Sequence, residues 1–155
     1  MTADVYERQI REFFELMDKW GVAMPAVKPL VSDFDLGEFD KIGLIEMWIA
    51  NEMEAGYCGK YLFVQDGQLC PSHHHKKKLE TFFIVKVEVE MTYDGKTFIM
   101  KPGDTKLVER GHNHAFKGKG PALILEVSQP CTDDDDFFED KRIPVGGDFI
   151  ASEHK

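Results

Sequence analysis

The sequence predicts an all-β domain, closed into a barrel or a double-sheet jelly roll, with one α-helix at its N-terminal end. From about residue 41 onward, short segments rich in β-branched and aromatic residues follow one another at roughly ten-residue spacing. Turn signals such as Asp66-Gly67 and Asp94-Gly95 separate these segments, and the second of them is a strong hairpin signal. Many short strands with turns between them are typical of barrels and jelly rolls.

Residues 1–40 are expected to form a helix and a connector that pack on the barrel. Between Asp4 and Gly21, apolar residues recur at three- and four-residue steps, which is the period of an amphipathic helix. Asp4 with Glu7 three residues later resembles a capping box, and glycine is a common residue at a helix end. The proline-containing stretch at 24–35 is expected to break regular structure.

Residues 41–155 are expected to form the barrel and a C-terminal tail. The predicted strands are 42–51, 60–65, 81–93, 96–101, 105–110 and 122–128. After Ser128 the chain is polar and poor in strand-forming residues, so we expect this tail to wrap the barrel. Its four consecutive aspartates, 133–136, are most simply a solvated turn, because calcium sites need a more regular spacing of oxygen ligands.

Composition narrows the classes of function. The chain has 155 residues, enough for one domain with a full core, and a formal net charge of −9 at pH 7. That charge argues against nucleic-acid binding, which needs a basic face to displace counterions. The apolar runs fall short of the roughly 20 residues that span a bilayer, and the first residues do not resemble a secretory signal. We therefore expect a cytoplasmic protein with no nucleic-acid or membrane partner.

The cysteines suggest neither a disulfide framework nor a thiolate zinc site. Cys58, Cys70 and Cys131 are few and scattered, and they form no CxxC pair.

The histidines are the first candidates for chemistry. Five of the six fall in two short segments, 73–75 and 112–114. Two polar loops are the simplest explanation, but alternation along a strand suggests another. Residues i and i+2 of a strand share a face, so His73 and His75 would point together while His74 points away.

A carboxylate and a further imidazole can complete a metal site. Glu80 follows closely enough to return to the same face, and His114 on a later strand can add a third imidazole. His112 competes with His114, because both share a face if that strand begins early. Three imidazoles and one carboxylate suit a divalent first-row ion, with positions left for water or substrate. Manganese is the ion we expect first, with zinc, iron, cobalt and nickel as alternatives.

The spacing of these residues matches two motifs of the cupin family. Between Gly67 and Glu80 the chain has a glycine, five residues, a His-x-His pair, four residues and a glutamate, which is the first motif. Between Gly103 and His114 it reproduces most of the second motif. Over about residues 57–130 the chain therefore resembles a cupin.

The resemblance implies a fold and a set of ligands. Cupins are double-stranded β-helices, that is, jelly-roll barrels, and the residues of the motifs bind a metal inside the barrel. The residues of this chain at those positions are His73, His75, Glu80 and His114. By the same resemblance, His74 faces outward and His112 is not a ligand.

Three positions depart from the cupin motifs. Val87 stands where the first motif usually has a turn glycine, Glu109 where the second has proline, and Gly118 where the second often has asparagine. All three are expected at turns or strand ends, so they bear on local loop shape and not on the ligands.

A closer resemblance covers about residues 56–145. The stretches YCGK, GQLCPSHHHKKKLETF and LEVSQPCTDDDDFFEDKRIP are similar to the short D-lyxose isomerase-like sugar isomerases of the cupin superfamily. Shared features are Cys-Pro before the histidines, a lysine two residues before the ligand glutamate, and an Asp-rich tail ending in Asp-x-Arg-Ile. This resemblance implies an aldose–ketose isomerase of a small unphosphorylated sugar, of the D-lyxose and D-xylulose kind.

Such a reaction moves a proton between C1 and C2 through an enediol. It needs a divalent ion at two sugar oxygens, a carboxylate that carries the proton, and a cation at the oxygen. Glu126 interrupts an apolar strand, where a charge is costly unless it reaches a partner or a cavity. We expect Glu126 to carry the proton, Lys78 to polarise or protonate oxygen, and Lys60 to contact the sugar. The plainer alternatives are an outward-facing edge residue for Glu126 and a solvated loop residue for Lys78.

Two other functions stay open. Some related cupins bind a sugar without converting it, and a metal-dependent oxygenase would use the same ligands with iron and dioxygen. A polar cavity with lysine and glutamate beside the metal favours the isomerase, whereas an apolar cavity favours the oxygenase.

A homodimer is also expected. Small cupins commonly pair through edge strands, and such pairing removes an exposed edge. The apolar segment 42–50 is the candidate strand.

Overall fold

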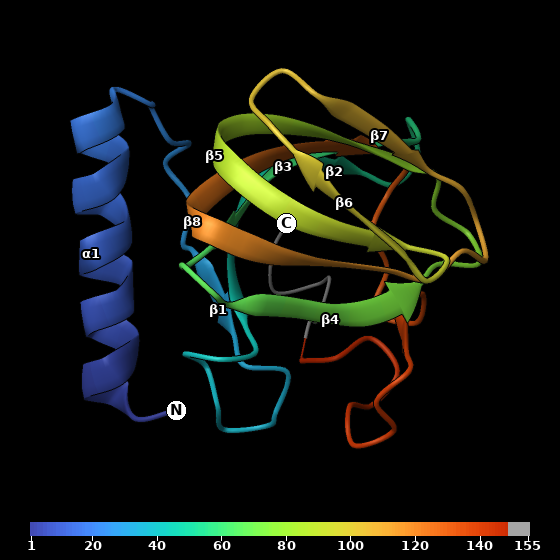
Figure 1. The fold of residues 1–155 in the computed structure, drawn as a ribbon, viewed down its shortest axis with the longest axis horizontal. Helices are drawn as coiled ribbons and strands as arrows, with labels where there is room; N and C mark the ends of the chain where they lie inside the picture. Colours follow the sequence, from blue (N-terminus) through green and yellow to red (C-terminus); the bar gives the residue numbers. More distant parts are fainter. Residues whose placement is uncertain (149–155) are drawn as a thin grey trace.

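Residues 1–148, the part of the chain that the computed structural model describes, form one helix and nine strands (Figure 1). The elements are α1 (Ala3–Trp20), β1 (Leu30–Ser32), β2 (Leu44–Glu52), β3 (Tyr57–Val64), β4 (Leu69–His74), β5 (Glu80–Tyr93), β6 (Lys96–Met100), β7 (Thr105–Val108), β8 (His114–Ser128) and β9 (Phe137–Phe138). Five of the six predicted strands are thus present within a few residues of their expected bounds, whereas the strand predicted at 122–128 is only the last part of β8, which begins at His114.

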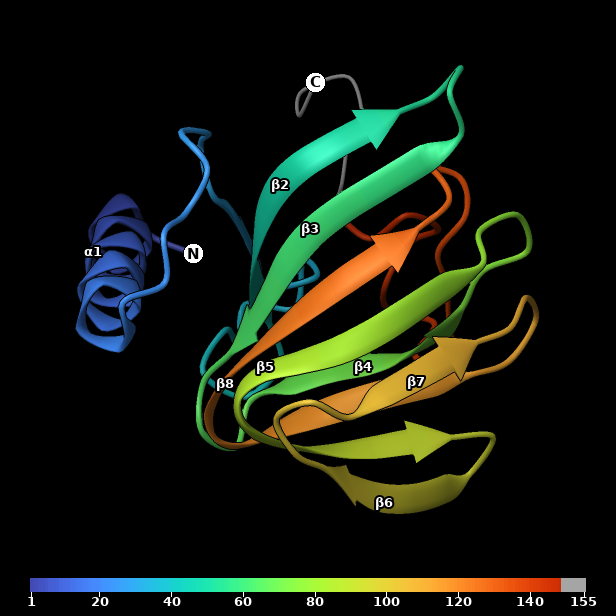
Figure 2. The same cartoon turned by 90° about the horizontal axis from the view of Figure 1, so that it is seen from above.

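The long strand β8 organises the sheet. Residues 122–128 of β8 pair with β3, while residues 114–117 pair with β4. On its other side β8 pairs along its length with β5, and β5 also pairs with β6 and with β7. All of these ladders are antiparallel, and the sheet curls around a common interior (Figure 2). The predicted all-β jelly-roll barrel with an N-terminal helix is confirmed.

The N-cap of helix α1 lies two residues before Asp4, the N-cap of the predicted capping box. Thr2 is the N-cap, and its hydroxyl accepts from the Val5 amide, so Asp4 lies inside the first turn. There its carboxylate is favourable beside the positive end of the helix dipole. Gly21 ends the helix as expected, with φ of 69°, a left-handed conformation that glycine adopts without steric cost.

Apart from β4, which lies outside the predicted ranges but was implied by the alternation of the histidines, two strands were not predicted. β1 lies in the stretch expected to be irregular, and β9 lies in the polar tail. Both are short edge strands, since β1 pairs only with β2, and β9 pairs only with the end of β4 among the described residues. Their backbone conformation depends on a partner strand that is distant in sequence, so local composition does not reveal them.

The apolar side chains form two main clusters on opposite faces of the sheet. The barrel interior holds the larger cluster, which includes Phe82, Ile84 and Phe116. A second cluster, around Phe13 and Phe63, fills the space between α1 and the outer face of the sheet. The helix therefore covers one part of the outer face and leaves the interior to the barrel strands (Figure 2).

Two of the departures from the cupin motifs, Val87 and Gly118, lie within β5 and β8 and not at turns or strand ends as expected. Val87 has φ of 66°, and the pairing of β5 with β8 shifts register across Val87 and once more just before it, between Ile84 and Lys86. The backbone at Val87 is thus in the left-handed region that a glycine would occupy more easily. Gly118 lies against another chain segment, because a Cβ there would be 2.3 Å from the Gln65 carbonyl oxygen.

This close approach generates a test of the fold. We expect Gly118→Ala to lower the free energy of unfolding by about 1–3 kcal/mol, the usual cost of inserting a methyl group into a packed site. Gly59→Ala is the matched control, since its added methyl would meet only the Ile49 Cβ at 4.0 Å. Urea unfolding followed by circular dichroism measures both. Equal midpoints for the two variants would contradict the close approach of Gly118 to the Gln65 segment.

Candidate functional site

Three histidines and a glutamate meet inside one end of the barrel. His73 lies near the end of β4 opposite His114, the first residue of β8, while His75 follows β4 and Glu80 begins β5. All four side chains are buried, with exposures between 0% and 9%. One ring nitrogen from each of the three histidines lies within 4.8 Å of the others, which is close enough for a shared ion.

Backbone carbonyls orient the three imidazoles. The Nδ1 atoms of His73, His75 and His114 lie 2.8, 3.0 and 3.0 Å from the carbonyl oxygens of Pro71, Asp135 and His112. A proton on Nδ1 that is donated to a carbonyl leaves the Nε2 lone pair free, which is the arrangement found in metal-binding histidines.

The carboxylate of Glu80 completes this donor set. Its Oε1 lies 3.2 Å from Nε2 of His75 and 2.9 Å from Nε2 of His114. Three imidazole nitrogens and one carboxylate are the donors that divalent first-row ions accept. The cluster therefore has the composition and geometry to hold a divalent metal.

His112 and His74 lie outside the cluster. β8 begins at His114, so His112 sits in the preceding turn, where its ring stacks on Tyr93 and contacts Asp94. The competing interpretation required the strand to begin before His112. The ring of His74 stacks on Phe137, on the side of β4 away from the other histidines.

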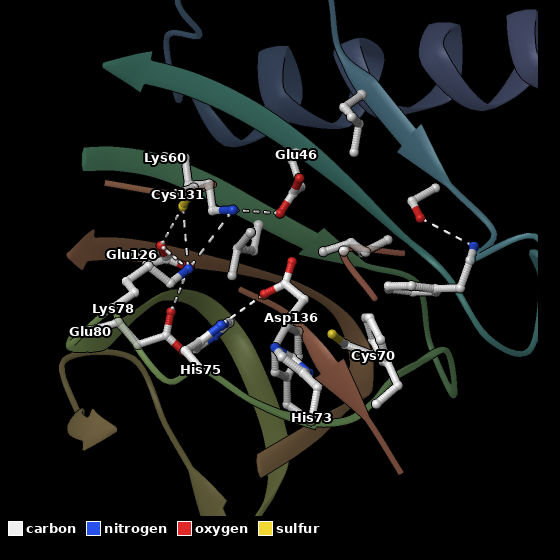
Figure 3. A pocket seen from close by; sticks show the side chains of 18 of the residues that line it. Glu46, Lys60, Cys70, His73, His75, Lys78, Glu80, Glu126, Cys131 and Asp136 are labelled. Carbon is white, nitrogen blue, oxygen red and sulfur yellow. Dashed lines mark hydrogen bonds and ion pairs between the residues drawn. The ribbon is translucent and has the colours of Figure 1, made fainter. Parts of the chain in front are cut away.

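Next to this cluster, a chain of ion pairs lines the pocket (Figure 3). Lys78 Nζ lies 3.1 Å from Glu80 Oε2 and 3.1 Å from Glu126 Oε2. Lys60 Nζ lies 4.0 Å from Glu126 Oε1 and 2.8 Å from Glu46 Oε1. These side chains are buried at 2–9% exposure, and they come from β2, β3, β5, β8 and the loop before β5. Glu126 therefore faces the interior, and Lys78 is not a solvated loop lysine.

The buried charges shift one another's pKa values. Burial disfavours the ammonium of Lys78, yet Cys131, Glu126 and Glu80 raise its pKa well above the ordinary value. Burial and Lys78 disfavour protonation of His75, but Glu80 and the Asp136 carboxylate outweigh them and raise its pKa to about 10. Glu80 is held well below its usual pKa, against the effect of burial, by Lys78 and His75. Positive charge is thus strongly favoured beside Glu80.

The aspartate run is not a solvated turn as a whole. Asp133 and Asp134 are exposed, but Asp135 is 2% exposed and Asp136 lines the pocket. Asp136 Oδ1 lies 2.8 Å from His75 Nδ1. The expectation that all four aspartates are solvated was wrong. The tail folds back along β4, and this path buries Asp135 and places Asp136 in the pocket lining.

Glu46, Asp136 and Cys131 are among the pocket residues that sequence reasoning missed. Glu46 interrupts the apolar strand β2 in the same way as Glu126 interrupts β8, so the same signal was available. Cys131 Sγ lies 3.3 Å from Lys78 Nζ and 3.7 Å from the Sγ of Cys58. Nothing local marks a tail cysteine as a pocket residue, because its position depends on the path of the tail.

The pocket has a polar and an apolar side. Lysine and glutamate side chains line the side near the histidines. The rest of the wall is mainly apolar, with Leu30, Phe34, Leu44, Leu62 and Phe138, and it also includes Ser32 and Asp148. A small ligand with several hydroxyl groups would find charged partners on one side and apolar contact on the other.

Comparisons with known proteins agree with this architecture. A family model described as a cupin domain matches residues 61–128, and one described as D-lyxose isomerase matches residues 30–86. A D-lyxose/D-mannose isomerase of Thermosediminibacter oceani is 28% identical over 141 residues, covering 73% of this chain and 77% of the relative. A D-lyxose ketol-isomerase of a Thermofilum species is 29% identical over 146 residues, covering 74% and 79%.

Solved structures support the fold. The L-ribose isomerase of Acinetobacter sp. DL28 in complex with L-ribose superposes with a TM-score of 0.79 at 17% identity, covering 97% of both chains. The L-ribose isomerase of Cellulomonas parahominis with L-ribose gives 0.78 at 17% identity, covering 94% of this chain and 96% of the other. Within residues 1–148, no helix has the length and apolar character needed to cross a membrane.

The histidine cluster generates a direct test. We expect His75→Ala to lose stoichiometric divalent metal, because it removes one donor and the partner of both Glu80 and Asp136. His112→Ala is the matched control and should keep one ion per chain, since His112 lies in an exposed turn. Elemental analysis after loading and dialysis measures metal content. Full metal in His75→Ala together with loss in His112→Ala would reverse the ligand assignment.

Proposed function

The chain has the cupin fold and resembles D-lyxose isomerases, and on this premise we propose that it is a metal-dependent aldose–ketose isomerase of a small sugar, of the D-lyxose and D-xylulose kind. The single observation that carries the proposal is the Lys78–Glu126 pair, which lies in the same pocket as the histidine cluster. A group that can move a proton, a cation and a metal-binding cluster thus share one small cavity.

The proposed ligands are His73, His75, Glu80 and His114, and the ion held there would act as a Lewis acid for the negative charge that develops on the sugar. Manganese is our first expectation, with zinc, iron, cobalt and nickel as alternatives, because this donor set accepts most of the series. The expected compartment is the cytoplasm.

In the proposed mechanism Glu126 carries the proton between C1 and C2. Ser128 Oγ donates to Glu126 Oε2 at 2.8 Å, and Lys78 Nζ lies 3.1 Å from the same oxygen. Oε1 is thus the oxygen with fewer close partners, since Lys60 Nζ is 4.0 Å away from it. We assign to Oε1 the removal of the C2 proton of the aldose and its return to C1 of the enediol.

Lys78 is proposed to serve the sugar oxygens. Its raised pKa keeps an ammonium between Glu80 and Glu126, where it can donate to an oxygen that gains negative charge. Lys60 lies farther along the wall, beside Glu46 and over the ring of Trp48, and is proposed to bind a hydroxyl of the sugar. Several buried charged groups beside the cluster favour a polyhydroxylated substrate over the oxygenase alternative.

The proton-carrier assignment gives a test. We expect Glu126→Gln to keep metal and sugar binding while turnover falls by about 10²–10⁴-fold, because an amide retains the shape but cannot take up a proton. The assay is exchange of the sugar C2 proton with solvent deuterium, followed by NMR with metal-loaded protein. Glu7→Gln on the exposed face of α1 is the matched control.

The outcomes separate three accounts. If the wild type exchanges the C2 proton and Glu126→Gln does not, the assignment is supported. If Glu126→Gln exchanges the proton at the wild-type rate, the base lies elsewhere. No exchange with any pentose or hexose would favour a sugar-binding protein without turnover. Lys78→Met should change both kcat and KM, because it removes a charge that serves binding as well as the reaction.

We also propose that the protein is a homodimer that pairs along β2. β1 pairs with residues 44–46 of β2, and beyond them a groove runs beside the strand. Val27, Ile49 and Met53 line this groove with exposures of 42%, 52% and 45%. A second copy along this edge would cover these side chains and supply hydrogen-bond partners for the backbone groups of the edge strand.

Light scattering at micromolar concentration tests the dimer. We expect a dimer mass for the wild type and a monomer mass for Ile49→Lys, because a charge in an apolar interface is costly. Ile99→Lys on β6, at the opposite end of the sheet (Figure 2), is the control and should stay dimeric. A monomeric wild type would overturn the proposal, and a dimeric Ile49→Lys would exclude this edge.

A further inference from the structure

Lys78 lies in a loop that no strand holds in place. The loop joins β4, which ends at His74, to β5, which begins at Glu80, and it also carries His75. A lysine has a long, flexible side chain, so the position of its ammonium depends on how firmly its backbone is fixed. The interactions that fix this loop therefore determine where the ammonium of Lys78 lies in the site.

One buried carboxylate binds three consecutive amides of the loop. Asp135 Oδ1 accepts from the backbone N–H of Lys76 and of Lys77, each at 2.9 Å, and Oδ2 accepts from that of Lys78 at 3.0 Å. The Asp135 side chain belongs to the tail, some 57 to 59 positions away in sequence. A carboxylate at 2% exposure is stable only because these charge-assisted bonds replace water.

Other bonds fix the two ends of the loop. His75 O accepts from the Gly111 amide at 2.7 Å, and the Leu79 amide donates to Gln129 Oε1 at 3.0 Å. Between these ends, the amide of Lys78 donates to Asp135 Oδ2. The side chain of Lys78 makes its own ion pairs with Glu80 and Glu126 only if its backbone stays in this place.

We propose that Asp135 is a positioning residue that sets the ammonium of Lys78 between Glu80 and Glu126. It acts through the 76–78 backbone and does not touch the substrate. The effect on turnover rests on the proposed isomerase function, whereas the effect on Lys78 itself does not. The neighbouring Asp134 provides a contrast, because it is exposed and pairs only with the exposed side chains of Lys77 and Thr132 in the described structure.

Asp135→Asn is the sharpest substitution. An asparagine oxygen can still accept from Lys76 and Lys77, but its amide group would face the Lys78 N–H, so two donors meet. Asp135→Ser, which keeps one acceptor in less space, is the second variant if the first folds poorly. Asp134→Asn is the matched control one residue away.

The first measurement is independent of catalysis. Trace acetylation of lysines, read by mass spectrometry, reports how accessible each ammonium is. We expect Lys78 to label several-fold faster in Asp135→Asn than in wild type and Asp134→Asn, while Lys60 stays protected on β3 by Glu46. Unchanged labelling of Lys78 overturns the proposal. Equal increases at Lys78 and Lys60 also overturn it, because they indicate general loosening of the pocket.

The second measurement is a double-mutant cycle. With metal content unchanged, Asp135→Asn should lower kcat by about 10–100-fold, the range typical when an outer partner of a site is lost. In the Lys78→Met background the same substitution should add almost nothing, since the group that it positions is gone. The same loss in both backgrounds would show a role that does not pass through Lys78. If the wild type converts no sugar, the proposed function fails and the labelling result alone decides the role of Asp135.

Discussion

Charge burial is the constraint on which the rest of this structure depends. Lys60, Lys78, Glu80 and Glu126 are buried inside the barrel, where an unpaired charge would cost several kcal/mol. Each therefore lies within ion-pair distance of an opposite charge, and the partners come from several strands and from the loop before β5. The network is stable only when the barrel is closed, so these ion pairs require the strands to meet in one register.

The C-terminal tail is part of this constraint and not an appendage. It pairs briefly with β4, places Asp136 beside His75, and lets Asp135 bind the loop that carries Lys78. A polar segment of this kind has too few apolar side chains to hold its place by burial alone. Hydrogen bonds from buried carboxylates to backbone amides supply the attachment, and they are stronger than neutral ones.

The proposed chemistry is divided between a strand, which carries Glu126, and a loop, which carries Lys78. Glu126 lies near the C-terminal end of β8, at a position paired with β3 on one side and with β5 on the other, which suits a group whose distance to the sugar must be reproducible. Lys78 comes from a loop and has several neighbours that can share its proton and charge. Both groups are held in place, Glu126 by its strand and Lys78 by the bonds of Asp135 to its loop, and a proton transfer between adjacent carbons needs such positioning.

The sequence by itself determined the all-β barrel, the helix and the two histidine segments, because side-chain periodicity and turn residues act locally. It also indicated Glu126, since a charge within an apolar strand needs an interior partner. Only the tertiary structure decided that Asp135 and Asp136 leave the solvent and that Cys131 enters the pocket. These residues lie in a tail without periodicity, and their environment is set by where the tail meets β4. A local pattern can show which face a strand residue takes, but not which distant segment will cover it.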